Sequence, residues 1–141
     1  MIDSGFLNQW RGLADVVLSV LIAEQTVGDG SRAHFDAVAY DIGLTDTSFP
    51  PKGNQIATWR AITELRQNNK TVHQTNILAT SYGATINAEW LATIITQYSE
   101  AIDGDVFNTN ADALKTFGER YLTLKAIDFA QQDLYANSRN P

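Results

Sequence analysis

Apolar residues recur every three or four positions through most of this chain, which is the period of a helix with one buried face. The pattern is clearest near the N-terminus, where the apolar stripe consists of Phe6, Trp10, Leu13, Val17 and Val20. Further apolar residues widen this stripe until the second half of the segment is apolar nearly all round, as in a helix at the centre of a fold. We therefore predict a central first helix of about 22 residues, capped by Asp3 or Ser4 and ended by residues 28–30.

A second, shorter helix is predicted at residues 32–42. Ser31 is a suitable N-cap, and Gly43 occupies the position where helices often end in a left-handed residue. The same residues also alternate apolar and polar side chains, so a strand is the alternative interpretation. Residues 44–54 contain two consecutive prolines and a glycine, which predicts a loop.

The remaining segments are also predicted to be helical. Asn54 is expected to cap a third helix at 55–69, and Asn87 is expected to cap a later one. Between these helices, the Thr-rich segment 71–83 carries a weaker helical pattern. The last helix is expected to run from about residue 110 to about residue 136. Its apolar face consists of Leu114, Phe117, Tyr121, Leu124, Ile127 and Leu134.

The predicted fold class is all-α. No alternating segments are joined by a hairpin dipeptide, and the chain shows no internal repeat and no interdomain linker. We expect one domain over residues 1–141, an irregular helical bundle of about five or six helices with long first and last helices. Residues 44–54 form its Pro/Gly loop, and residues 137–141 are expected to be a polar C-terminal tail.

The polar composition favours a protein that packs against other proteins. Apolar residues make up 44% of the 141 residues and charged residues only 18%. The balance is largely Thr, Ser, Asn and Gln, whereas lysine is scarce. Interface cores are depleted in Lys, Glu and Asp, so a surface of this kind is easy to desolvate. Cysteine is absent, which excludes disulfides and thiolate chemistry.

The charge is acidic and unevenly distributed. The net charge is −6, and acidic residues predominate most strongly in the first fifty residues. An acidic balance argues against general nucleic-acid binding, which depends on neutralising phosphates. The middle third has a local excess of basic residues that can serve as a docking surface for an acidic partner or a neighbouring copy. Single-stranded nucleic acid is a weaker alternative, and an ordinary solvated face with an Arg60–Glu64 pair is the simplest interpretation.

Two regions supply candidate interface residues. The first is the basic middle third with its adjoining tryptophan, although burial in the core is the simpler interpretation of that ring. The second is the C-terminal end of the last helix and its tail. The candidates from both regions are Lys52, Trp59, Arg60, Arg66, Lys70, Tyr135 and Arg139.

The acidic stretch DGDVFNTNAD at 103–112 resembles a calcium loop in composition only. An EF-hand needs an oxygen ligand at its fifth position, glycine at its sixth and glutamate at its twelfth. Counted from residue 103, those positions hold Phe107, Asn108 and Leu114. The alternative is a turn followed by a helix start, with Thr109 and Asp112 as a capping box.

Other signals for chemistry are weak. His34 and His73 are far apart in sequence, and neither has a second histidine or a cysteine at metal-ligand spacing. They are expected to be surface or capping histidines. The chain contains no nucleophile elbow, no metalloprotease motif and no glycine-rich phosphate loop. We therefore predict no enzyme, no cofactor and no metal, with an enzyme of unrecognised site as the third hypothesis after the two given below.

The segment near the N-terminus indicates neither export nor membrane insertion. It lacks a basic region before an apolar stretch, and the apolar run Val16–Ala23 is interrupted by Ser19 and too short to span a bilayer. We expect a cytoplasmic protein without membrane contact.

These observations lead to two predicted functions. The first is a non-enzymatic structural or assembly protein, a small helical subunit of a homo-oligomeric particle such as a viral or phage virion. Its partners would be copies of itself or another protein. The alternative is an acidic binding module of the immunity or anti-defence type, which inhibits or neutralises a partner by electrostatic complementarity. Its expected face consists of Asp29, Asp36, Asp41 and Asp46.

Overall fold

The computed structural model describes residues 2–26, 33–98 and 104–139. The α-helices are α1 (Ser4–Thr26), α2 (Ala33–Asp36), α3 (Asn54–Gln67), α4 (Gln74–Ala79), α5 (Ala88–Tyr98) and α6 (Gly104–Arg139). They are joined by the π-helical turn η1 (Ala37–Ile42) and the 3₁₀ turns η2 (Asp46–Ser48) and η3 (Gly83–Thr85). The structure is 82% helical, and no strand occurs within these ranges. The predicted all-α bundle with long first and last helices is confirmed. The features predicted at residues 28–31 and 103 lie outside the described residues.

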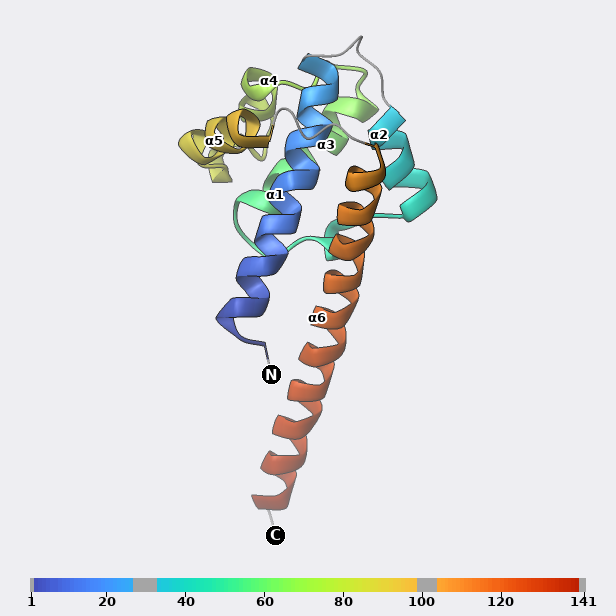
Figure 1. Cartoon of the computed structure of the whole chain (residues 1–141). Coiled ribbons are helices and arrows are strands. Elements are labelled where there is room, and N and C mark those ends of the chain that lie inside the picture. The colour runs from blue at the N-terminus through green and yellow to red at the C-terminus, as the bar shows by residue number, and fades with distance from the viewer. Residues whose placement is uncertain (1, 27–32, 99–103, 140–141) are drawn as a thin grey trace.

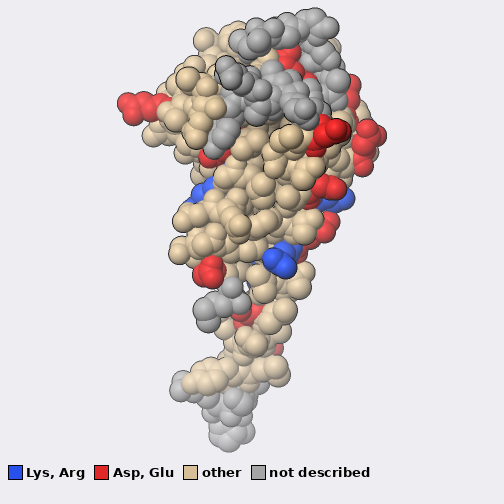
Figure 2. Space-filling model, in the orientation of Figure 1, with Lys and Arg blue, Asp and Glu red and all other residues tan. Residues whose placement is uncertain are grey.

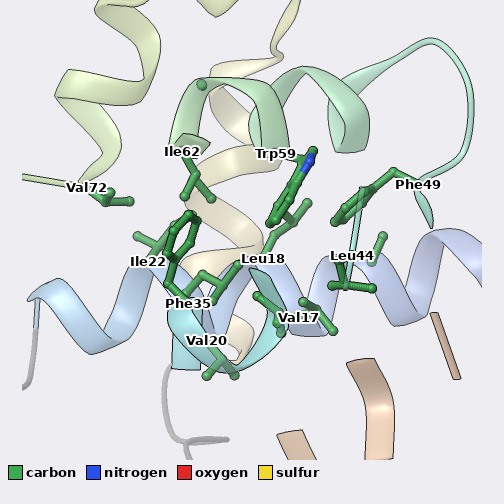
Figure 3. Close-up of a cluster of buried hydrophobic side chains, with 14 of the residues drawn as sticks. Val17, Leu18, Val20, Ile22, Phe35, Leu44, Phe49, Trp59, Ile62 and Val72 are labelled. Carbon is green, nitrogen blue, oxygen red and sulfur yellow. The ribbon is translucent and has the colours of Figure 1, made fainter. Parts of the chain in front are cut away.

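Helix α1 lies at the centre of the bundle, as its apolar pattern predicts. It packs against α3, α5 and α6, and α6 runs antiparallel to it (Figure 1). Trp10, Val17, Leu18 and Leu21 are completely buried. Figure 3 shows side chains from α3 and from the segment at 35–49 gathered over α1. The predicted cap is also present, because the backbone N–H of Phe6 donates to Asp3 Oδ1 over 2.8 Å.

The same helix is the one described segment that is long and apolar enough to cross a membrane, over Ser4–Glu24. An unbroken apolar run is too strict a criterion to detect it, since Ser19 interrupts the run. Half of this segment's most apolar window is buried inside the bundle. Its contacts with α3, α5 and α6 account for its apolar character.

The predicted second helix changes its geometry halfway. It is α-helical over Ala33–Asp36 and π-helical over Ala37–Ile42, so the strand alternative is wrong. Gly43 ends it with φ of 78°, as predicted. The N–H groups of Gly43 and Leu44 both donate to the carbonyl of Val38, over 2.9 and 2.8 Å. These two bonds provide hydrogen-bond partners for backbone groups at the end of the helix.

One predicted cap is confirmed and another is wrong. Asn87 caps α5, because its Oδ1 accepts from the N–H of Trp90 over 2.9 Å. Asn54 does not cap α3, since the capping position is occupied by Gly53. The Oδ1 of Asn54 instead accepts from the N–H of Asn87 over 2.8 Å. The start of α3 is thereby tied to the start of α5, a tertiary contact that the local sequence pattern does not contain.

The boundaries predicted for the last helix are wrong at both ends. Helix α6 has 36 residues and is about 54 Å long, since each residue adds 1.5 Å. It begins at Gly104, so Thr109 lies inside it and not at its cap. The Thr109 hydroxyl donates to the carbonyl of Asp105 over 2.9 Å, a bond within the helix rather than the predicted capping bond. The predicted tail at 137–141 is helical as far as Arg139.

Candidate interaction surface

Among the described residues, only the first half of α6 packs against the other helices and turns. Phe107, Ala111 and Leu114 are completely buried. At Gly118 the helix approaches η2 so closely that an added Cβ would lie 2.8 Å from the Cα of Ser48. The absence of a side chain at this position lets the helix and the turn come together.

We call the described residues that precede α6 (2–26 and 33–98) the body. Four aromatic rings form the last contact between α6 and the body. The ring centroids of Phe6 and Phe117 are 5.0 Å apart, and those of Trp10 and Tyr121 are also 5.0 Å apart. The ring centroids of Phe6 and Trp10 are 5.9 Å apart. Because Phe6 is in the first turn of α1, the body ends close to this cluster. The C-terminal half of α6 continues alone beyond it (Figure 1).

We call residues 122–139 the stalk. Figure 2 shows its described part as a narrow extension of the body with few charged side chains on the face in view. Leu124 is partly buried, but the other large apolar side chains of the stalk are exposed: Leu122 by 47%, Ile127 by 48%, Phe129 by 72%, Leu134 by 69% and Tyr135 by 59%. Single exposed apolar residues are ordinary on a protein surface, but a contiguous apolar surface marks an interaction site.

The stalk contains a regular apolar seam. Leu124, Ile127 and Leu134 recur at intervals of three and seven, and Gln131 completes the three-four-three pattern of heptad positions a and d. We call these four residues the a/d stripe. Leu124, Ile127 and Leu134 also belong to the apolar set predicted for the last helix, of which Leu114 is buried in this chain. A seam with this spacing is the one that coiled coils bury between helices.

The stalk is nearly neutral, which favours contact between identical surfaces. Lys125 and Arg139 balance Asp128 and Asp133. The Nζ atom of Lys125 lies 5.8 Å from the ring centroid of Tyr121, so part of the positive charge is directed back toward the body. Copies of this segment can approach one another without strong electrostatic repulsion.

The predicted basic patch is divided by the fold. Lys52 and Lys70 are exposed, and Arg60 is half-exposed. The Nε of Arg60 pairs with Asp46 Oδ2 over 3.0 Å, and not with the predicted Glu64. Arg66 is not on the surface at all, since only 6% of it is exposed.

The buried position of Arg66 has an electrostatic explanation. Its Nη2 lies 3.5 Å from Oε1 of Glu24, which is also buried, and its guanidinium lies 5.4 Å from the centre of the Phe35 ring. The same Glu24 oxygen accepts from the N–H of Phe35 over 3.1 Å. Arg66 therefore joins α1, α2 and α3 inside the core and is unavailable to a partner.

The remaining predicted interface residues, Trp59, Tyr135 and Arg139, lie in different parts of the structure. Trp59 is 5% exposed and stacks on Phe49 with centroids 5.0 Å apart, which places it in the core (Figure 3). Tyr135 is exposed on the stalk. Arg139 is the last residue of α6, and its side chain lies outside the described part of the chain. Of the predicted residues whose side chains are described, only Tyr135 lies on the exposed apolar surface of the stalk.

The described residues contain little that suggests catalysis. Within the described ranges, no three His, Cys, Asp or Glu side chains are grouped closely enough to hold a metal ion. His73 caps α4, since its Nδ1 accepts from the N–H of Asn76 over 3.4 Å, as expected for a capping histidine. A depression of about 270 Å³ between α3 and α4 is polar and open, and small-molecule sites are usually enclosed and apolar.

One carboxylate within the bundle is electrostatically perturbed. Burial raises the pKa of Asp15 above 3.8, while hydrogen bonds from Gln55 and Trp90 act in the opposite direction. The Nε2 of Gln55 donates to Asp15 Oδ1 over 3.0 Å. The three residues come from α1, α3 and α5, so this group links three helices and is explained by the packing alone.

Comparison of this chain with protein-family models, with curated proteins and with solved structures finds no match.

Proposed function

We propose that this protein is a non-enzymatic assembly subunit that forms a homo-oligomer through its stalk. The observation that carries the proposal is the emergence of α6 from the body with Ile127 and Leu134 of its a/d stripe exposed. An isolated helix of this length is marginally stable in water, because most helical stability in proteins comes from packing. The stalk therefore gains stability when another helix covers Ile127 and Leu134.

The occupant we propose is the stalk of a second copy of this chain. Parallel copies lying side by side place the a/d stripe of one stalk at the same height as the exposed apolar side chains of the next. Gln131 interrupts the stripe, and one polar residue at an a position costs some stability but selects one register over shifted ones. The balanced charge of the stalk favours the same pairing.

A cytoplasmic location before assembly and a place in a larger particle, such as a virion, are part of this proposal. They rest on composition and on the exposed stalk. Each body would remain outside the contact between stalks, free to form a second layer of contacts. The low lysine content of the chain supports burial of further surface.

Light scattering coupled to size exclusion tests the proposal. The full chain is expected to have a mass several times 15.5 kDa at micromolar concentration. Leu134→Glu places a carboxylate in the a/d stripe and is expected to reduce that mass. Gln132→Glu adds the same charge two residues away, outside the stripe, and is expected to preserve it. A monomeric wild type would contradict the proposal.

A second candidate function is an acidic module that masks a basic protein partner. Tyr40 on η1 is 79% exposed, and Asp36 and Asp41 beside it are exposed carboxylates. Figure 2 shows acidic side chains along the edge of the body where α2 lies. Aromatic residues within a charged rim are typical of binding hot spots. A monomeric wild type, unaffected by stalk substitutions, would favour this function over assembly.

A further inference from the structure

The stalk carries a second apolar stripe on its other side. Leu122, Ala126, Phe129 and Ala136 recur at intervals of four, three and seven, and Asp133 completes the series. In the heptad defined by the a/d stripe they occupy positions c and f, so we call these five residues the c/f stripe. Leu122 and Phe129 are 47% and 72% exposed. Both stripes have the same seven-residue repeat and therefore remain on opposite sides along the whole stalk.

The angle between the stripes is wide. At about 100° per residue, the centres of the a/d and c/f stripes are about 160° apart around the helix axis. A two-stranded coiled coil buries one seam and would leave the c/f stripe in water. The described residues of the body do not cover it either, since Phe129 is the most exposed apolar residue of the stalk.

We propose that each stalk packs between two neighbouring copies, with its a/d stripe against the c/f stripe of the next copy. This inference rests on the proposed assembly function and specifies its geometry. Contacts between two different surfaces of identical chains generate rings or open arrays rather than dimers. A ring of three or four helices needs seams about 60° or 90° apart, so seams about 160° apart indicate a ring on the order of a dozen copies or more.

The position of the body agrees with this arrangement. Phe107, Leu114 and Tyr121 show the side of α6 that faces the body, and on the helix this side lies opposite Ala130. Ala130 and Thr123 lie within the narrower angle between the stripes, which must face the inside of a ring. The bulky bodies are thereby placed on the outside, where a ring has room for them.

The two stripes are complementary in size. The a/d stripe is bulky at Leu124, Ile127 and Leu134, whereas the c/f stripe alternates the large residues Leu122 and Phe129 with the small residues Ala126 and Ala136. Large residues facing small ones allow neighbouring helices to interdigitate.

The polar residues of the two stripes also match. Each stripe is interrupted by one polar residue, and Gln131 and Asp133 differ in height by only about 3 Å. The Gln131 amide of one copy can therefore donate to the Asp133 carboxylate of the next.

Complementation between two full-length variants tests the ring. Ile127→Glu disables the a/d stripe and Phe129→Glu disables the c/f stripe. Each variant alone is expected to be monomeric by light scattering, since it lacks one half of the contact between stalks. An equimolar mixture is expected to form a heterodimer of about twice 15.5 kDa, because each variant supplies the stripe that the other lacks. Heterodimer formation also shows that both variants are folded. The control Gln132→Glu is expected to keep the wild-type mass.

The opposing results distinguish the two proposals. A wild type that is a discrete dimer, or a Phe129→Glu variant that keeps the wild-type mass, overturns the ring while leaving self-assembly intact. Homodimers of either variant, or a mixture that stays monomeric, also overturn it. A monomeric wild type overturns both the ring and the assembly function.

Discussion

The indole Nε1 of Trp10 donates to the backbone carbonyl of Ser48 over 2.8 Å, and both residues are buried. This bond fixes the turn η2 against α1, and the same turn lies against α6 at Gly118. Trp10 is also one of the rings at which α6 leaves the body. The origin of the stalk therefore depends on a contact between residues 38 positions apart in the sequence.

Trp10→Phe should test this contact. The substitution keeps an aromatic ring but leaves the Ser48 carbonyl without its donor and creates a small cavity. We expect the free energy of unfolding to fall by about 2–4 kcal/mol. Urea unfolding followed by circular dichroism measures it. A loss below about 0.5 kcal/mol would show that the hydrogen bond has no net stabilising effect.

Gly118→Ala should destabilise the protein although alanine is the better helix former. The new Cβ would press on the backbone of Thr47 and Ser48, which cannot rotate away as a side chain can. We expect a net loss of about 1–3 kcal/mol, despite a gain of about 1 kcal/mol in helix propensity. Gly12→Ala in α1 is the matched control, since nothing lies within 4 Å of its added Cβ. That variant should be stabilised by about 0.5–1 kcal/mol in the same unfolding measurement.

Glu24→Gln should be strongly destabilising. The amide can still accept from the N–H of Phe35, but Arg66 loses the negative charge of the Glu24 carboxylate, which lies 3.5 Å from its Nη2. Removing one partner of a buried ion pair costs about 3–5 kcal/mol. The double variant Glu24→Gln with Arg66→Met should recover part of this loss, which a double-mutant cycle of unfolding free energies would measure. Equal losses in the single and double variants would be inconsistent with the pair.

Asp15→Asn should change how stability depends on pH. Burial raises the folded-state pKa of Asp15 above 3.8, so between that value and the raised pKa the folded state binds more protons than the unfolded state. The stability contributed by Asp15 is therefore present below pH 3.8 and is lost as the pH rises through the raised pKa. Asparagine is uncharged and can still accept from Gln55. The variant should become more stable relative to wild type as the pH rises from about 3 to about 7.

Urea titrations at several pH values measure this difference. Asp112→Asn, at an exposed site on α6, controls for the loss of one carboxylate. A constant difference between wild type and Asp15→Asn would show that the group does not titrate differently on folding.

The two capping positions should respond differently to alanine. Asn87→Ala removes the acceptor for the N–H of Trp90 and should cost about 1 kcal/mol. Thr109→Ala lies inside α6, where its hydroxyl bonds only to the carbonyl four residues earlier. It should change stability by less than about 0.7 kcal/mol, and in the stabilising direction, because alanine is the better helix former. Thermal unfolding of both variants makes the comparison.

Local periodicity was sufficient to predict the fold class but only part of the site. The caps at Asp3 and Asn87 and the left-handed Gly43 follow from short-range backbone geometry, and the structure contains all three. Asn54 and Arg66 were assigned wrongly because their partners, Asn87 and Glu24, are 33 and 42 residues away. No local pattern records such partners. The predicted basic patch is not a single surface for the same reason, since Arg60 pairs with Asp46, 14 residues away, and Arg66 is buried.

The sequence by itself determined that apolar residues recur at helical spacing along the whole last helix, because a period of three and four residues is a property of the chain. Only the tertiary structure decided which of these residues are covered. Leu114 is buried because α1 and η2 reach it, whereas Leu134 is 69% exposed because α1 begins at Ser4 and the body ends near Tyr121. Burial depends on the neighbours that the fold brings to a residue, and hydrophobicity alone does not specify whether those neighbours belong to the same chain or to another copy.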